Sequence, residues 1–234
     1  MLEVRALDLY YGDARALEAV SLEVSKGDIV ALVGANGAGK SSLIRAIAGI
    51  EKPRGGKVYF AGRDITGFDS HETCNLGIGQ VAEGRQLFPT LTTSENLEMG
   101  AMLPRARAQA RQKMEEVFAL FPRLSERKKQ LAGTLSGGEQ QMLAIARCLM
   151  GCPELIMADE PSLGLAPAMT QELLRAICAL NQKGLTVLLV EQNVAVSLKI
   201  SHRAYVLENG RIVGSGAGGQ LLSDDRVRQA YLGL

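Results

Sequence analysis

Eight residues near the start of the chain constrain its fold more than any other feature. Residues 34–41 read Gly-Ala-Asn-Gly-Ala-Gly-Lys-Ser, which satisfies the phosphate-loop pattern G-x-x-x-x-G-K-[ST]. The apolar run 29–33 precedes the loop and has the pattern of a buried parallel strand, and residues 43–48 after it have a helical pattern. This strand–loop–helix context predicts an α/β fold with a nucleotide at the loop.

The chemistry of the loop favours a nucleoside triphosphate with Mg²⁺. Its glycines let backbone N–H groups converge on phosphate oxygens, and the following helix N-terminus adds partial positive charge. We expect Lys40 to reach the β- and γ-phosphates and Ser41 to ligate Mg²⁺. The residues predicted to bind ATP here are Gly34, Ala35, Asn36, Gly37, Ala38, Gly39, Lys40, Ser41 and Ser42.

A second segment, which is acidic, is expected to complete the catalytic half of the site. Residues 155–158 are apolar, and Asp159 and Glu160 follow them at the predicted carboxyl end of a central strand. Asp159 would hold Mg²⁺, usually through water, and Glu160 would accept a proton from the attacking water. Taken alone, an Asp-Glu-Pro triplet also often just ends a strand, but the upstream phosphate loop favours the catalytic interpretation.

A second anion site is predicted 96 residues after Lys40. Residues 135–140 read Leu-Ser-Gly-Gly-Glu-Gln directly before the helical pattern of residues 140–150, so this segment would crown a helix N-terminus. One nucleotide cannot easily use both sites of one chain, so the motif makes sense if it closes over ATP bound to a different subunit. The residues assigned to this contact are Ser136, Gly137, Gly138 and Glu139.

Composition excludes several other classes of function. The chain has 234 residues with 47% hydrophobic content, which fits one large α/β domain with room for a subdomain. Its net charge of +1 gives no strong field for nucleic acid or anionic lipid. The four cysteines lack metal or disulfide spacing, which favours reduced thiols in the cytosol. We find no signal-peptide pattern and no apolar run long enough to span a bilayer, so any role at a membrane would require partner proteins.

Periodicity divides the chain into an α/β core and a helical block. We expect one ATPase domain over residues 1–234, with residues 1–92 and 153–234 forming the core and a β subdomain, and residues 93–152 forming a helical subdomain that carries the second motif. A helix start is predicted at Thr93, and a solvated basic face at Arg123, Arg127, Lys128 and Lys129. The other expected elements are strands 3–7, 17–24, 57–61, 78–81, 186–190 and 204–207, turns at 10–13, 62–64 and 208–211, and helices 105–121 and 224–232.

Together these motifs resemble the ATP-binding-cassette (ABC) ATPases over essentially the whole chain. The resemblance implies a P-loop NTPase (RecA-like) core with an N-terminal antiparallel β subdomain and an inserted α-helical subdomain. It also implies that Tyr11 stacks on adenine, as the aromatic residue just before Gly12, although Tyr11 could instead be an ordinary strand-end tyrosine. In this family the segment 135–140 is the signature, which caps the γ-phosphate on the other subunit of a head-to-tail dimer that encloses two ATP molecules.

Three positions depart from the common pattern of the family. Glu83 stands where glutamine is usual, Gln192 where histidine is usual, and Ala166 where aspartate is usual. Glu83 can still approach Mg²⁺ or the attacking water, whereas Gln192 can hydrogen-bond a γ-phosphate oxygen but carries no positive charge. One explanation is a degenerate, inactive ATPase, but Lys40 and Glu160 are intact. The LivF-type ATPases of branched-chain amino-acid importers are similar in a set of segments that includes these departures, namely residues 83–85, 135–143, 160–167 and 190–193 and the ending 230–233.

The resemblance implies an ATP-hydrolysing importer subunit, peripheral to the cytoplasmic face of the inner membrane. Its implied partners are two membrane permease subunits, a second cassette ATPase in a heterodimer or a copy of itself in a homodimer, and indirectly an external solute-binding protein. No nucleic acid is expected. The loop 83–90 and the helical block should form a groove for a helix of a membrane subunit. Alternatives are an importer of urea, short amides or other amino acids, a soluble ABC ATPase, and a regulatory subunit that binds nucleotide without turnover.

Overall fold

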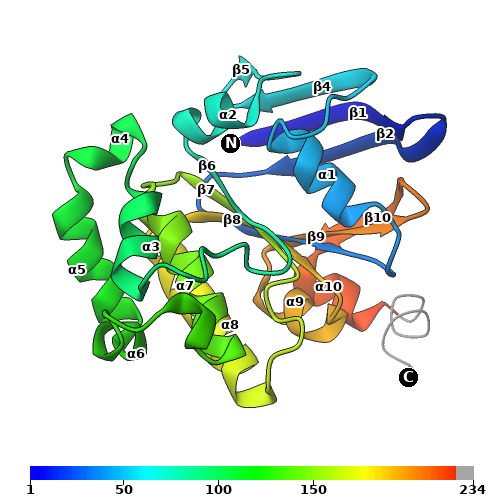
Figure 1. Cartoon of the computed structure of the whole chain (residues 1–234). Helices are drawn as coiled ribbons and strands as arrows, with labels where there is room; N and C mark the ends of the chain where they lie inside the picture. Colours follow the sequence, from blue (N-terminus) through cyan, green and yellow to red (C-terminus); the bar gives the residue numbers. More distant parts are fainter. Residues whose placement is uncertain (225–234) are drawn as a thin grey trace.

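Two β-sheets organise the chain in the computed structural model, which describes residues 1–224. A four-stranded antiparallel sheet has the order β2-β1-β4-β5, and a six-stranded sheet has the order β10-β9-β3-β8-β7-β6 (Figure 1). The first sheet comprises β1 (Leu2–Tyr11), β2 (Ala14–Val24), β4 (Gly55–Phe60) and β5 (Arg63–Asp64). The second comprises β3 (Ile29–Val33), β6 (Ile78–Val81), β7 (Leu155–Asp159), β8 (Thr186–Glu191), β9 (Arg203–Glu208) and β10 (Arg211–Ala217).

The centre of the six-stranded sheet is parallel. β3 pairs in parallel with β8 and β9, and β7 pairs in parallel with β8 and β6, while β10 adds an antiparallel edge. Every residue of β3, β7 and β8 is buried, because helices or strands cover both faces, and this is why these segments are almost uniformly apolar. The buried parallel strands predicted at these positions are confirmed, and their carboxyl ends share one edge.

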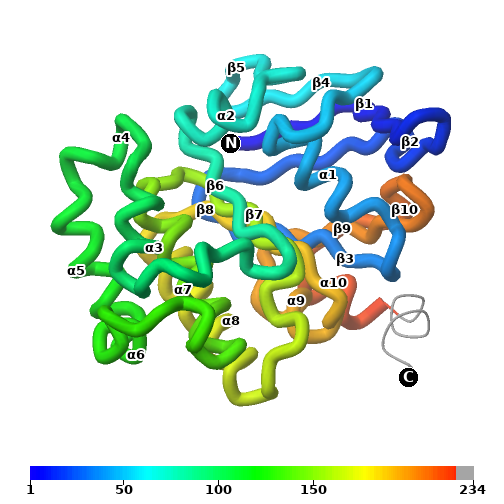
Figure 2. Tube along the Cα trace, in the orientation of Figure 1, coloured from blue at the N-terminus to red at the C-terminus, as the bar shows by residue number. Residues whose placement is uncertain are grey.

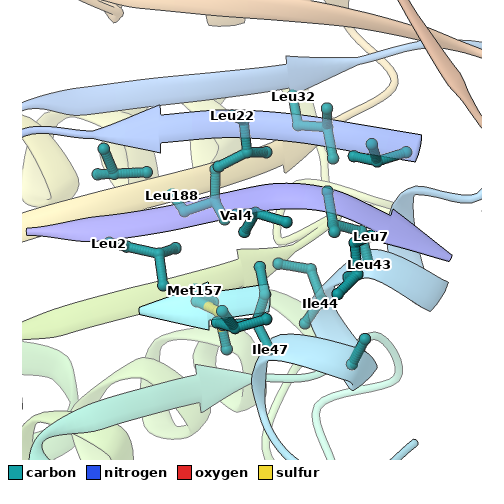
Figure 3. Close-up of a cluster of buried hydrophobic side chains, with 14 of the residues drawn as sticks. Leu2, Val4, Leu7, Leu22, Leu32, Leu43, Ile44, Ile47, Met157 and Leu188 are labelled. Atoms are coloured by element: carbon teal, nitrogen blue, oxygen red, sulfur yellow. The ribbon is translucent and has the colours of Figure 1, made fainter. Parts of the chain in front are cut away.

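One face of this sheet packs against helix α1 (Lys40–Ile47) and the antiparallel sheet. Figure 3 shows Leu2, Val4, Leu7 and Leu22 of the antiparallel sheet gathered with Leu43, Ile44 and Ile47 of α1, and with Leu32, Met157 and Leu188 of the central sheet; all ten side chains belong to one buried cluster. The helix that begins at Lys40 is thereby fixed between two sheets, which gives the phosphate loop a rigid base.

The opposite face is covered by helices from two parts of the chain (Figure 2). Near β6, β7 and β8 the covering helices come mainly from the block after β6, together with the helix that follows β7. Near β3 and β9 the last two helices form a smaller buried cluster. The covering helices are α3 (Thr93–Gly100), α5 (Ala110–Leu120), α6 (Pro122–Glu126), α7 (Gly137–Met150), α8 (Pro167–Gln182), α9 (Val194–Ile200) and α10 (Gly218–Ser223).

The single helix predicted over 105–121 is wrong, because the segment forms two helices. The short helix α4 (Pro104–Arg107) ends before Gln109, and α5 begins at Ala110. Two arginines fix α4 in its own orientation: Arg105 pairs with Glu154 at 3.3 Å, and Arg107 Nε donates to the Met102 carbonyl at 3.1 Å. These tertiary contacts leave no trace in helical periodicity.

The other predicted helices and strands differ from the observed ones mainly in their length. The first two strands are longer than expected, and β5 and a short 3₁₀ turn (Ala132–Thr134) were not expected as elements. Helix α2 (Ser70–Leu76) was missed, although its Asp69-x-x-Glu72 capping box was legible: the Asp69 N–H donates to Glu72 Oε2 at 2.8 Å. The hairpin turn at Asn209 and Gly210 is confirmed by their φ angles of 46° and 77°. The predicted tail 224–232 lies outside the described residues, except for Asp224.

A buried asparagine fixes the loop after β6. Asn96 is 0% exposed, and its Nδ2 donates to the carbonyls of Phe88, Leu91 and Thr92 at 3.0, 3.3 and 3.0 Å. Its Oδ1 accepts the Phe88 N–H at 3.0 Å. This one side chain therefore supplies the hydrogen bonds that a short irregular segment cannot make within itself.

Replacing Asn96 with alanine is expected to lower the free energy of unfolding by about 2–4 kcal/mol, because buried loop groups lose their partners. Urea denaturation followed by circular dichroism measures this loss. Glu98→Ala, on the exposed side of the same helix, is the matched control and should change the free energy by less than about 0.5 kcal/mol. Equal losses in the two variants would contradict a clamping role for the amide.

Candidate nucleotide site

Four loops meet at the carboxyl edge of the central parallel strands. The phosphate loop follows β3, Glu83 follows β6, Asp159 and Glu160 end β7, and Gln192 follows β8. Because these strands are parallel neighbours, their carboxyl ends lie at one edge, where open α/β sheets place ligands. Residues from segments more than 100 positions apart in the sequence are thus brought to one place.

These loops line a cavity of about 650 Å³. The predicted residues on its wall are Tyr11, Asn36, Gly37, Gly39, Lys40, Ser41, Ser42, Glu83, Glu160 and Gln192. Five further lining residues were not predicted, namely Arg15, Ala16, Leu163, Asn209 and Gly210. The Asn209-Gly210 turn was visible in the sequence only as a hairpin, and nothing local showed that sheet packing would carry it to the phosphate loop.

Lys40 is held ready at the base of the loop. Its side chain is 3% exposed, and Nζ donates to the carbonyls of Gly34 and Ala35 at 3.0 and 3.1 Å. Nζ also lies 3.3 Å from Glu160 Oε1. A buried ammonium group requires such partners, and Glu160 is the one that also carries charge. The phosphate-loop lysine and the predicted catalytic carboxylate are therefore direct neighbours.

Backbone geometry explains the residue types at two positions. A side chain at Gly34 would overlap the Leu207 carbonyl oxygen of β9, so only glycine fits where the loop leaves β3. Glu160 has φ 45°, a left-handed conformation that a non-glycine residue adopts only when its surroundings impose it. Its N–H donates to the Val190 carbonyl of β8 at 2.9 Å, which extends the β7–β8 pairing by one residue before the chain turns.

Asp159 has the properties of a cation ligand. It is buried, and its Oδ1 has no hydrogen-bond partner among the described residues. Burial raises the pKa of the carboxyl group, and the neighbouring charges of Glu160 and Glu83 raise it further, while Ser41 and Lys40 oppose the rise. A divalent cation would relieve the repulsion between these carboxylates, so the residues fit the predicted Mg²⁺.

Three more predicted side chains stand at the rim of this cavity. Tyr11 is 43% exposed at the end of β1, and its hydroxyl group lies 3.5 Å from Ser42 Oγ. Glu83 and Gln192 are both exposed on loops after their strands. Exposed aromatic and polar groups around a phosphate loop can adapt to a nucleotide without first breaking packing contacts.

The segment 135–140 lies outside this cavity and caps helix α7. The Ser136 N–H donates to Glu139 Oε2 at 2.8 Å, and Ser136 Oγ accepts the Glu139 N–H at 3.4 Å, so the two residues form a capping box. The other Glu139 oxygen lies 2.7 Å from Arg127 Nε. Arg127 thus has a structural partner that was not predicted, while its side chain stays 39% exposed. Arg123, Lys128 and Lys129 are exposed, as expected for a solvated face.

The two predicted binding segments of one chain thus do not share a cavity. Ser136 is exposed, and the first turn of α7 presents free backbone N–H groups beside it. The carboxylate of Glu139 is already engaged by its own helix cap and by Arg127. The Ser136 end of the segment is the part that remains available to a phosphate group.

A separate groove of about 380 Å³ lies where the loop after β6 meets the helical block. Phe88 and Met99 are 44% and 41% exposed at its wall. Arg147 crosses the groove: its guanidinium carbon lies 5.2 Å from the centre of the Phe88 ring, and it donates to the Gln86 carbonyl at 2.5 Å. The groove therefore combines apolar surface with two cationic groups, because Arg85 lines it as well.

The fold and the site define the protein as a phosphate-loop ATP-binding cassette. The profile of the ABC transporter family matches residues 17–163, so the chain belongs to this family. It is 48% identical to the high-affinity branched-chain amino acid transport ATP-binding protein BraG of Pseudomonas aeruginosa, over 100% of both chains. It is also 35% identical to the probable branched-chain amino acid transport ATP-binding protein LivF of Archaeoglobus fulgidus, over 100% of this chain and 99% of the relative.

Solved structures agree with this assignment. An ATP-binding cassette of an ABC transporter in its ADP conformation superposes with a TM-score of 0.88 at 31% identity, covering 100% of this chain and 99% of that one. A nucleotide-free cassette gives the same TM-score and identity, with 99% and 98% coverage. No helix within residues 1–224 is both long enough and apolar enough to cross a membrane.

Proposed function

We propose that this chain is the ATP-hydrolysing subunit of an ABC importer for branched-chain amino acids. The observation that carries the proposal is the cavity in which Lys40, Glu160, Glu83 and Gln192 meet at the carboxyl edge of four strands. In this proposal residues 34–42 bind the phosphates of ATP and Tyr11 stacks on the base. Hydrolysis then depends mainly on positioning and electrostatics.

Mg²⁺ would be held by Ser41, Asp159 and Glu83, and when bound it neutralises charge on the phosphates. The unpartnered Asp159 oxygen and the cluster of carboxylates support this assignment. Glu160 would accept a proton from the attacking water, which it can reach from its position beside Lys40. Gln192, which follows β8 between the phosphate loop and Glu160, would hydrogen-bond a γ-phosphate oxygen.

The working unit would be a dimer in which Ser136, Gly137, Gly138 and Glu139 of one subunit close over ATP on the other. Support comes from the separation of the two segments, because the signature end of α7 lies outside the phosphate-loop cavity of its own chain. The second subunit would be a different cassette ATPase or another copy of this chain. We further propose that residues 93–152 act as the helical subdomain, and that residues 1–92 and 153–234 act as the core.

Of the two membrane permease subunits in the complex, one would insert a cytoplasmic helix into the groove beside Phe88 and Met99, which places the chain peripherally at the cytoplasmic face of the inner membrane. The groove offers apolar surface with Arg147 at its edge, which suits a short amphipathic helix with an acidic residue. An external solute-binding protein would be linked only through the permeases. Nucleic acid has no role in this proposal.

The substrate assignment rests on relatives. BraG and LivF both carry branched-chain amino acid transport in their names, and BraG matches along its whole length. Urea, short amides or other amino acids remain the alternative cargo. A soluble ABC ATPase is the alternative from another class, and its partners would be different.

The experiment is purification of the tagged chain from its native cell after crosslinking in mild detergent, followed by mass spectrometry. Two polytopic membrane proteins and a second cassette ATPase are expected. The assembled complex, reconstituted in vesicles with its binding protein, should then hydrolyse ATP faster with leucine than with urea. Recovery of only soluble partners would overturn the importer assignment, and stimulation by urea alone would overturn the cargo assignment.

Replacing Gln192 with histidine is expected to leave kcat for ATP hydrolysis within about tenfold of the parent, because both side chains can donate a hydrogen bond to phosphate. The exposed position of Gln192 leaves room for the ring. Steady-state phosphate release measures the effect, with the neighbouring exposed Asn193→His as control. A complete loss with histidine at 192 would show that the surroundings are built around the amide.

A further inference from the structure

Glu191 is a buried carboxylate that the proposed reaction does not use. It is the last residue of β8, it is 3% exposed, and it accepts the Ser162 N–H on Oε1 at 2.9 Å. Burial raises the pKa of its carboxyl group, the Ser162 hydroxyl group and the Ser162 and Gln192 N–H groups oppose this rise, and the charge of Glu160 adds to it. A charged or polar side chain in such a place requires a reason, because its desolvation is costly.

Hydrogen bonds from two consecutive residues of β8, Val190 and Glu191, flank the predicted catalytic residue. Before Glu160 turns away from the sheet, its N–H is held by the Val190 carbonyl at 2.9 Å. Two residues later, the Ser162 N–H is held by the Glu191 side chain. Consecutive residues of β8 therefore fix the backbone on both sides of Glu160, one through its main chain and the other through its side chain.

The backbone conformation between the hydrogen bonds at the Glu160 and Ser162 N–H groups is unfavourable and requires both bonds. Glu160 has φ 45°, which an unsupported glutamate would leave for a more favourable conformation. Within the loop, the Glu160 carbonyl accepts the Leu163 N–H at 3.1 Å, and the Ser162 carbonyl accepts the Leu165 N–H at 3.1 Å. These bonds join the loop only to itself, whereas the bond to Glu191 joins the loop to the sheet.

We propose that Glu191 is a positioning residue that holds the loop after β7 and thereby aims the Glu160 carboxylate. The inference rests on the proposed ATPase function and deepens it by adding a buried residue that is not among those lining the nucleotide cavity. The hydrogen bonds, rather than the negative charge, are the feature that matters, because the partners are neutral groups: the N–H and hydroxyl groups of Ser162 and the N–H group of Gln192. A glutamine can supply the same acceptor oxygen, and an alanine cannot.

The test measures ATP hydrolysis by the full chain, or by its complex if partners are needed, for Glu191→Ala and Glu191→Gln. We expect Glu191→Ala to lower kcat about 10- to 100-fold with KM for ATP changed less than about threefold, because a misplaced base affects the reaction more than binding. Glu191→Gln should stay within about threefold of the parent. Glu172→Gln, an exposed carboxylate on α8, is the control and should have no effect.

Hydrogen exchange of the Ser162 amide provides a readout that is independent of turnover. Exchange in peptides spanning residues 160–166 should be about tenfold faster or more in Glu191→Ala and unchanged in Glu191→Gln, while β3 peptides stay protected in both. If the alanine variant does not fold, Glu191→Leu fills the buried volume without an acceptor and is used in its place.

Several results would overturn the inference. One is that Glu191→Ala, or Glu191→Leu in its place, keeps kcat within threefold of the parent. Another is that Glu191→Gln is as impaired as Glu191→Ala. A third is that the exchange rate of the Ser162 amide does not change when the acceptor is removed. A parent protein that hydrolyses no ATP with its partners would instead refute the proposed function. The two failures are distinguishable because exchange at Ser162 is measured without ATP.

Discussion

Replacing Glu160 with glutamine is expected to lower kcat for ATP hydrolysis by about 100- to 1,000-fold, as is typical for loss of a general base. The amide keeps the shape of the side chain and its position beside Lys40, from which Glu160 Oε1 is separated by 3.3 Å. It is a poor proton acceptor, so the attacking water loses its base while the ATP contacts remain. KM for ATP should therefore change little.

Because binding persists while turnover stops, this variant should also accumulate the ATP-bound dimer. Size-exclusion chromatography with light scattering, in the presence of Mg-ATP and any required partner ATPase, should detect it. The parent should return to the monomeric or partner-free state as ATP is consumed. Glu172→Gln controls for the loss of one carboxylate, and undiminished turnover in Glu160→Gln would refute the assignment of the base.

Replacing Lys40 with alanine is expected to abolish ATP turnover, with a fall in kcat/KM of at least about 1,000-fold. The ammonium group is the buried positive charge at the base of the loop, where it already faces the carbonyls of Gly34 and Ala35. Without it, the β- and γ-phosphates lose a charge-assisted hydrogen bond and Glu160 loses its cationic neighbour. The loss of the phosphate contact and the loss of the cation beside Glu160 should both slow ATP hydrolysis.

Phosphate release and titration with a fluorescent ATP analogue separate the two consequences for Lys40→Ala. Binding should weaken and turnover should fall below detection. Lys199→Ala, which removes an exposed lysine on α9, should behave as the parent. Near-normal activity in Lys40→Ala would contradict the phosphate-loop role and with it the proposed ATPase function.

The sequence predicted the central features of the fold because their signals are local. Residues 29–33 and 187–190 are apolar throughout, since parallel strands are covered on both faces. The helix start after Ser136 and the Asn209-Gly210 turn depend on chemistry within a few residues. The same is true of the phosphate loop, whose glycines and lysine act through their own backbone and side chain.

Predictions were wrong or incomplete where distant partners decide the outcome. In the segment where α4 and α5 separate, Arg105 of α4 pairs with Glu154, a residue 49 positions away in the sequence. Arg127 looked like part of a basic surface run, but it pairs with Glu139 at the start of α7. In each case the residue type permits several roles, and the partner lies on another element.

The sequence by itself determined the family, the phosphate loop, the acidic pair at 159–160 and the signature segment, because each is a contiguous motif. Only the tertiary structure decided that the Asn209-Gly210 turn lines the same cavity as Lys40, and that Glu191 bonds to the loop after Glu160. The reason is geometric: parallel strands distant in the sequence place their ends along one edge, and a side chain there bonds to whatever neighbour the sheet order supplies.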